Sequence, residues 1–204
     1  MIKEIYNVDD QARRFGYSAI KFAAELFLES ENTSDPDFLD IKDFIPEYAV
    51  VNKSEAELRE YFKTVQIWRD VEDIFVHCAA TQPHASVSAI LGYWKNTLKW
   101  KNVGYHILIG PDFYVILSNP NNVTNGVQGF NSKGFHISYI GGIDKVGKAK
   151  DTRTEYQKKI IGVCLEESRK RWPKARVRGH NEVKAKACPS FSVRDQYPLY
   201  WRNK

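Results

Sequence analysis

The sequence predicts an α/β fold in which a mixed central β-sheet is flanked by helices, with a small helical extension at the N-terminal end. Two observations predict it. After residue 73, short apolar runs of strand length alternate with longer segments whose apolar residues recur every three or four positions. Before residue 70, only the helical spacing is found. A content of 43% hydrophobic residues is sufficient for a packed core.

The N-terminal extension is expected to contain two helices. The apolar face of the first comprises Tyr17, Ile20, Ala24, Phe27 and Leu28, and the polar, proline-containing stretch 29–37 interrupts that pattern. The second helix is predicted to begin at Ser54, because Ser54-Glu-Ala-Glu57 has the form of a capping box. Its apolar face comprises Leu58, Tyr61, Phe62, Val65 and Trp68.

The remaining elements are predicted in the following order. A buried strand over 74–76 ends at His77, and an amphipathic helix carries Val87, Ile90, Leu91, Trp94 and Leu98. Strands over 105–109 and 113–117 are separated by the turn Gly110-Pro111-Asp112, and a strand over 135–140 is closed by Gly141-Gly142. A long helix begins near Thr152 or Thr154 and runs to Arg171 before Pro173, and a final strand over 175–179 leads into His180.

Charge divides the chain near residue 70. Residues 1–70 hold 15 acidic and 9 basic residues (net −6), whereas residues 71–204 hold 10 and 21 (net +11). We therefore expect an acidic extension over 1–70 and a separate domain over 71–204. The basic part favours an anionic partner such as nucleic acid, a membrane surface or a cell-wall polymer, although solubility alone also explains it.

The cysteine count and the terminal segment indicate a protein kept in the cytoplasm. Three cysteines without dense spacing do not suggest a disulfide framework. The N-terminal residues lack the features of a secretory signal, and no stretch is long and apolar enough for a membrane span. No stable insertion into a membrane is expected.

Two histidines and a cysteine form a candidate zinc site. His77 and His180 each follow a strand-like run, and Cys188 lies eight residues beyond His180. Two imidazoles and one thiolate can hold a catalytic zinc with its fourth position open. Taken singly, each histidine is better explained as a hydrogen-bonded structural residue.

The residues around this candidate site resemble a known family. The resemblance covers about residues 74–197 and rests on motifs in the same order: Ile74-Phe-Val-His77-Cys-Ala-Ala-Thr81, Val103-Gly-Tyr105-His106, Gly141-Gly-Ile-Asp144, and Gly179-His180 with Lys186-Ala-Cys188-Pro-Ser-Phe191. They resemble the bacteriophage and prophage N-acetylmuramoyl-L-alanine amidases, a group that includes phage lysozyme-like amidases and is related to the peptidoglycan-recognition proteins.

The resemblance implies one Zn²⁺ per chain, held by His77, His180 and Cys188, with Tyr105 and Lys186 as the catalytic residues beside it. It implies hydrolysis of the peptidoglycan amide that joins the lactyl group of N-acetylmuramic acid to L-alanine, and cell-wall lysis of the endolysin type. The enzyme would wait in the cytoplasm, as a monomer, until a separately encoded holin-type factor opens the membrane.

Residue chemistry suggests roles for the two catalytic candidates. Zinc polarises a carbonyl and lowers the pKa of bound water toward about 7. Lys186 can stabilise the oxygen that becomes negative in the tetrahedral intermediate, and Tyr105 can orient water or substrate. The structural alternatives are a solvated lysine and a tyrosine packed at a sheet edge.

For the other cysteines, histidines and polar residues, the sequence supports less specific predictions. Cys78 and Cys164 are expected in the core, and His84, His106 and His136 are expected to make local hydrogen bonds. His106 is also a candidate to support the site from behind the metal ligands, and Glu182 is a candidate acid or base. Many members of the similar family have a histidine ahead of Gly-x-Asn, where this chain reads Asn125-Gly-Val-Gln128-Gly-Phe-Asn131. Gln128 and Asn131 are therefore candidate substrate-binding residues, but Gln128 cannot carry a proton at neutral pH.

Other functions remain as alternatives. A non-catalytic peptidoglycan-binding protein would need neither Tyr105 nor Lys186 nor Cys188. Nucleic-acid binding lacks any recognised module, and we expect none. The acidic extension is either an appendage packed on the basic domain or a wall-recognition module.

Overall fold

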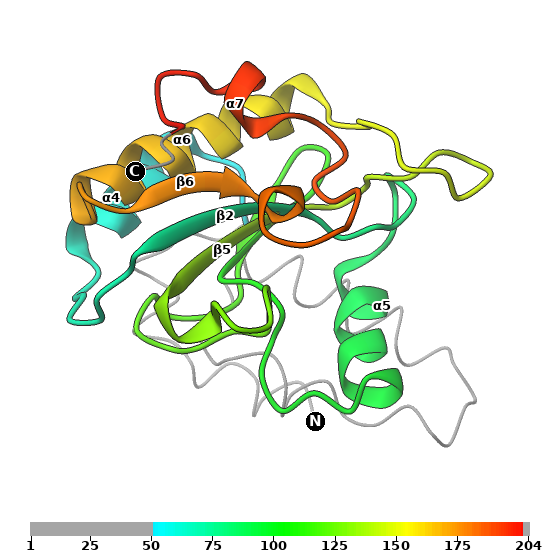
Figure 1. Ribbon diagram of the computed structural model, residues 1–204, viewed down its shortest axis with the longest axis horizontal. Helices are drawn as coiled ribbons and strands as arrows, with labels where there is room; N and C mark the ends of the chain where they lie inside the picture. The colour runs from blue at the N-terminus through cyan, green and yellow to red at the C-terminus, as the bar shows by residue number, and fades with distance from the viewer. Residues whose placement is uncertain (1–50, 202–204) are drawn as a thin grey trace, which may run out of the picture.

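The computed structural model describes residues 51–201, in which one mixed sheet forms the centre of the fold (Figure 1). Its strands occur in the order β1-β4-β3-β5-β2-β6, and β1 and β3 pair with β4 antiparallel while the other pairs are parallel. The strands are β1 (Val51–Asn52), β2 (Asp73–Cys78), β3 (Ile107–Ile109), β4 (Tyr114–Ile116), β5 (Gly134–Tyr139) and β6 (Arg176–Gly179). The expected mixed sheet is confirmed.

Helices lie on both faces of this sheet. They are α4 (Glu55–Thr64), α5 (Val87–Gly92), which continues into the π-helical turn η2 (Tyr93–Thr97), α6 (Glu155–Arg171) and α7 (Val193–Gln196). Short 3₁₀ turns are η3 (Asn131–Lys133) and η4 (His180–Glu182). The central strand β2 is buried along its whole length, which explains its continuous apolar run.

Helices α4 and α6 pack together over one face of the sheet. The Ser54 hydroxyl caps α4 by accepting a hydrogen bond from the Glu57 N–H at 3.3 Å, and Leu58 and Phe62 are buried beneath the helix. Thr154 and Gln157 form a reciprocal capping box at the start of α6. Both predicted helix starts are confirmed.

The opposite face of the sheet is covered in part by α5 and η2. Leu91 and Trp94 pack there against Leu108 and Val115, which point away from α6. Leu98, expected on the apolar face of this helix, follows it and is partly exposed. His77 and His136, which are described below, are also buried.

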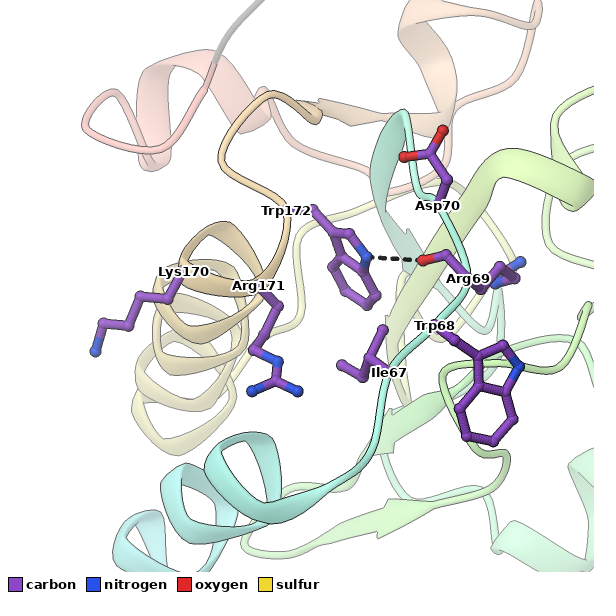
Figure 2. A pocket seen from close by; sticks show the side chains of 7 residues that line it. All are labelled: Ile67, Trp68, Arg69, Asp70, Lys170, Arg171 and Trp172. Atoms are coloured by element: carbon purple, nitrogen blue, oxygen red, sulfur yellow. Dashed lines mark hydrogen bonds between the residues drawn. The ribbon is translucent and has the colours of Figure 1, made fainter.

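Trp68 is a clear departure from the predicted apolar face of α4. The helix ends at Thr64, and the Trp68 side chain is 78% exposed at the edge of an open pocket of about 460 Å³ (Figure 2). There the Trp172 indole donates a hydrogen bond to the Arg69 carbonyl at 3.1 Å. The prediction for Trp68 was wrong because α4 ends one turn early.

The change of charge near residue 70 does not coincide with a break in packing. Strand β1 and helix α4 precede it, yet they belong to the same sheet and core as the later elements. Residues 51–70 hold four acidic and four basic residues, so the net charge of −6 resides in residues 1–50. The predicted helix from Tyr17 to Leu28 and the interruption over 29–37 lie outside the described residues. Within residues 51–201, no helix combines the length and apolar character of a membrane span.

Candidate metal centre

Two neighbouring parallel strands place the two histidines side by side at their carboxyl ends. His77 lies near the end of β2, and His180 directly follows β6, which pairs with β2 in parallel. Cys188 returns to this edge from the loop after η4. The candidate ligand atoms of these three residues all lie within 4.8 Å of one another. The structure therefore brings together the three residues that the sequence marked.

The chemistry of the three donors fits a zinc ion. Burial, and then the charge of His180, holds the pKa of His77 well below its ordinary value. Burial followed by the charges of Lys186 and Lys184 lowers the pKa of His180 to about 4. Both imidazoles are neutral at pH 7, so each offers a lone pair. A set of two neutral imidazoles and one sulfur suits zinc.

The Cys188 sulfur faces His77 and the end of β2. Its Sγ lies 3.6 Å from Nδ1 of His77 and accepts a hydrogen bond from the Cys78 N–H at 3.3 Å. The neighbouring Cys78 thiol, and then burial, raise the pKa of Cys188, while the charge of Lys186 acts in the opposite direction. A divalent cation at these donors displaces a thiol proton, so zinc and the thiolate would stabilise each other.

Cys78, the last residue of β2, is buried in the core, as expected, and so is Cys164 on α6. The Cys78 thiol also lies 3.7 Å from the Ser190 hydroxyl and contacts the Cys188 thiol. These contacts place Cys78 directly beneath the loop that carries the candidate ligand.

Two hydrogen bonds and a cation–π contact hold the loop around Cys188 in place, and the sequence did not predict them. The Tyr139 phenol donates a hydrogen bond to the Pro189 carbonyl at 2.8 Å, and the Ser190 hydroxyl donates one to the Gly142 carbonyl at 2.8 Å. The Arg153 guanidinium lies 3.3 Å above the centre of the Phe191 ring. Each partner comes from a distant segment, so no local pattern could have marked it.

Arg153 is itself held in place by hydrogen bonds to Asp151, Tyr197 and Gln196. Asp151 accepts hydrogen bonds from its Nε at 2.9 Å and its Nη2 at 2.8 Å, and the Arg153 Nη1 donates to the Tyr197 hydroxyl at 2.9 Å. The Arg153 side chain is fully buried, so this pairing satisfies a charge that burial would otherwise destabilise. The Phe191 end of the loop thus rests on a rigid support.

Tyr105 lies beside His77, one of the three candidate ligands. Its hydroxyl donates to the Cys78 carbonyl at 3.3 Å, and its ring centre is 5.0 Å from that of His77. Burial, and then negative charge on the Cys188 and Cys78 sulfurs, raise the pKa of Tyr105 well above its ordinary value. The phenol keeps its proton at neutral pH and can act as a hydrogen-bond donor.

Lys186 lies in the exposed loop between His180 and Cys188. Its charge lowers the pKa of both of these residues, which places the ammonium group within electrostatic reach of the candidate ligands. The side chain is exposed and is therefore available to a bound molecule.

Of the remaining candidates, Glu182 and Asn131 make hydrogen bonds within the protein, whereas Gln128 is exposed. The Glu182 carboxylate accepts hydrogen bonds from the Gly179 N–H at 2.7 Å and the Trp201 indole N–H at 2.9 Å. The Asn131 side chain accepts one from the Val127 N–H at 2.7 Å and shapes its own loop. Gln128 is exposed in the turn before η3.

His106 was a candidate to support the metal ligands directly, but His136 lies between His106 and His77. Its Nδ1 accepts a hydrogen bond from the His136 N–H at 3.0 Å, and its Nε2 is 3.1 Å from the Asn122 carbonyl. The ring that contacts a candidate ligand is that of His136, whose Nδ1 is 3.1 Å from Nε2 of His77. His136 was expected to make a local hydrogen bond, but its ring contacts His77, which is 59 residues away in the chain.

Solved structures show the same fold. The Ph2119 endolysin from a Thermus scotoductus MAT2119 bacteriophage matches with a TM-score of 0.54 and 23% identity, over 67% of this chain and 88% of that chain. Drosophila peptidoglycan recognition protein SD matches with 0.53 and 17%, over 69% and 88%. The N-acetylmuramoyl-L-alanine amidase LysCS from Clostridium intestinale matches with 0.52 and 16%, over 66% and 86%. These likenesses confirm the expected amidase-like architecture.

Comparison of sequences identifies the family. No protein-family model matches the chain. The endolysin of Enterobacteria phage K11 is 33% identical over 127 residues, which are 61% of this chain and 84% of that protein. The endolysin of Escherichia phage T7 is 33% identical over 123 residues, 59% and 82% of the two chains. With a third of the aligned residues identical over more than four fifths of each relative, this chain belongs to the bacteriophage endolysin family.

Proposed function

We propose that this chain is a zinc-dependent peptidoglycan hydrolase that lyses bacterial cell walls. The observation that carries the proposal is the convergence of donor atoms from His77, His180 and Cys188 within 4.8 Å at the carboxyl ends of two parallel strands. Membership of the endolysin family supports a cell-wall substrate. One zinc per chain would supply Lewis acidity and an activated water at this position.

The proposed reaction is hydrolysis of the amide between the lactyl group of N-acetylmuramic acid and L-alanine. An amide is a poor electrophile, so negative charge that develops on its carbonyl oxygen must be stabilised. Lys186 can supply this stabilisation, because its side chain is exposed in the loop between His180 and Cys188 and its positive charge acts on both of these residues. The amidase motifs in residues 74–191 support this choice of bond.

We assign Tyr105 a positioning role through its hydroxyl. A phenol that retains its proton donates a hydrogen bond to the substrate carbonyl or the attacking water, and does not act as a general base. Glu182 is a weaker candidate for proton transfer, since both carboxylate oxygens already accept hydrogen bonds. The exposed Gln128 amide remains a candidate contact for the polar substrate.

The proposal extends to how the protein reaches its substrate. We propose that it acts as a monomer on peptidoglycan after release from the cytoplasm by a separately encoded holin-type factor.

We also propose that the acidic N-terminal segment docks on the basic amidase domain. Deleting residues 1–50 preserves β1 and α4, so sacculus binding by the shortened and full chains tests this docking. A gain on deletion indicates masking, and a loss indicates a recognition module instead.

A clearing assay tests the enzymatic proposal. The purified protein should clear a turbid suspension of outer-membrane-stripped cells, EDTA should stop clearing, and added zinc should restore it. Cys188→Ala should abolish both bound zinc and clearing, whereas Cys164→Ala, which removes a buried thiol on α6, should retain both. Binding to sacculi without clearing would indicate the non-catalytic alternative.

A further inference from the structure

We propose that His136 is a positioning residue for the metal centre: it accepts a hydrogen bond from His77 and thereby selects the nitrogen that His77 offers to zinc. This inference rests on the proposed zinc function. The two residues lie on neighbouring strands, β5 and β2, where Phe75 pairs with His136 and His77 pairs with Ser138.

The two nitrogens of His77 point to different partners. Its Nε2 is 3.1 Å from Nδ1 of His136, while its Nδ1 is 3.6 Å from the Cys188 sulfur. A neutral imidazole has one N–H and one lone pair. If Nε2 carries the proton and donates it to His136, the lone pair of Nδ1 faces the cysteine. This tautomer is the one that binds a metal shared with Cys188.

His136 can accept this hydrogen bond only when its own proton is on Nε2. That atom is buried and has no hydrogen-bond partner among the residues that the structure describes. Buried polar atoms are nearly always paired, and an unpaired one needs an explanation. The contact with His77 explains why the sheet retains a buried imidazole here.

The surroundings of His136 hold its ring in one orientation. The ring is nearly parallel to those of Phe75, at 5.4 Å and 7°, and His106, at 5.9 Å and 10°. Gly126 and Gly134 approach its two nitrogens so closely that an added Cβ would lie 2.3 Å from Nδ1 and 2.6 Å from Nε2. The loop at Gly126 and the start of β5 therefore leave space for this ring and for no further side chain.

The contact has a measurable consequence for zinc binding. The free N–H of a metal-bound histidine usually donates to a carboxylate, a carbonyl or water, and loss of that partner weakens metal binding by about 10- to 100-fold. Here the acceptor would be a neutral imidazole. It would fix the His77 ring and increase the basicity of the nitrogen that faces the metal.

Zinc affinity, measured by competition with a chromophoric chelator, tests the role. His136→Ala should weaken binding by about 10- to 100-fold. His136→Asn should recover part of the loss, because the Asn side-chain oxygen can replace Nδ1 as acceptor. Cys164→Ala is the control, because it removes a buried side chain on α6 that is not one of the candidate ligands. It should lower Tm but leave zinc affinity near that of the wild type.

A spectroscopic measurement on the wild type makes the test independent of variant folding. In ¹⁵N-histidine NMR spectra of the zinc-loaded protein, His77 should show a protonated Nε2 and a metal-bound Nδ1. Zinc on Nε2 of His77, unchanged zinc affinity in His136→Ala, or an equal loss in Cys164→Ala would each overturn the role of His136. A wild-type chain that binds no zinc would overturn the proposed function and this inference with it.

Discussion

The Tyr139 hydroxyl donates a hydrogen bond to the carbonyl of Pro189 at 2.8 Å, which ties strand β5 to the residue that follows Cys188. The phenol is buried, so water cannot replace it when it is removed. The position of one candidate ligand therefore depends on a side chain from the centre of the sheet.

Tyr139→Phe should weaken zinc binding and lower stability by about 1 kcal/mol, the usual net contribution of such a hydrogen bond. Tyr114→Phe is the control, because Tyr114 is also buried and donates to the Ser54 carbonyl at 3.0 Å. Chelator competition and thermal unfolding measure both effects. Equal zinc affinity in the two variants would show that the Tyr139 contact does not support the metal centre.

Lys186→Ala should retain about one zinc per chain and lose most amidase activity, because the variant lacks the cation near the developing oxyanion. Lys184→Ala removes a second charge that also lowers the pKa of His180, and it should reduce activity much less. Metal analysis and release of soluble peptides from sacculi provide the two readouts. Full activity in zinc-loaded Lys186→Ala protein would refute the oxyanion role.

Tyr105→Phe should reduce activity without changing the shape of the pH–rate profile. Burial, and then the two neighbouring sulfurs, raise the pKa of Tyr105, so the phenol is protonated on both sides of neutrality. Its removal eliminates a hydrogen-bond donor and no titrating base. Loss of one limb of the profile in the variant would instead identify Tyr105 as a proton-transfer group.

Glu166 should stabilise the fold only above acidic pH. Its hydrogen bond with Arg59, at 3.0 Å, and then that with Lys170 lower its pKa from 4.5 to about 2. A carboxylate with a depressed folded-state pKa contributes stability above its unfolded pKa, and the contribution is lost as the pH falls from about 4.5 toward 2.

The Tm difference between wild type and Glu166→Gln should therefore narrow progressively below about pH 4.5. Glu60→Gln provides the control, since Glu60 and Lys63 form an exposed pair at 3.5 Å, which contributes little. A Tm difference for Glu166→Gln that stays constant on acidification would contradict this pairing.

Much of the fold could be predicted because its signals are local. The capping residues Ser54 and Thr154 mark the helix starts, and the apolar run before His77 marks a buried strand. Strand order, and the six-stranded sheet that includes β1, depend on distant pairings, which a single sequence does not reveal. Trp68 was misplaced because nothing local indicated that α4 ends at Thr64.

The same limit applies to the candidate site: its ligands could be predicted from local signals, but the residues that support them could not. His77, His180 and Cys188 could be selected because metal-binding residue types follow predicted strands and lie within recognisable motifs. His136, Tyr139 and Arg153 could not, because each acts through a partner between 38 and 59 residues away in the chain. These supporting contacts exist only in the folded sheet.

The identity of the cleaved bond tests the central proposal most directly. Mass spectrometry of peptidoglycan digested by the zinc-loaded protein should show free stem peptides that begin with L-alanine, together with glycan strands whose muramic acid carries a free lactyl carboxylate. Products cut within the glycan strand or within the stem peptide, or the absence of soluble products, would contradict it.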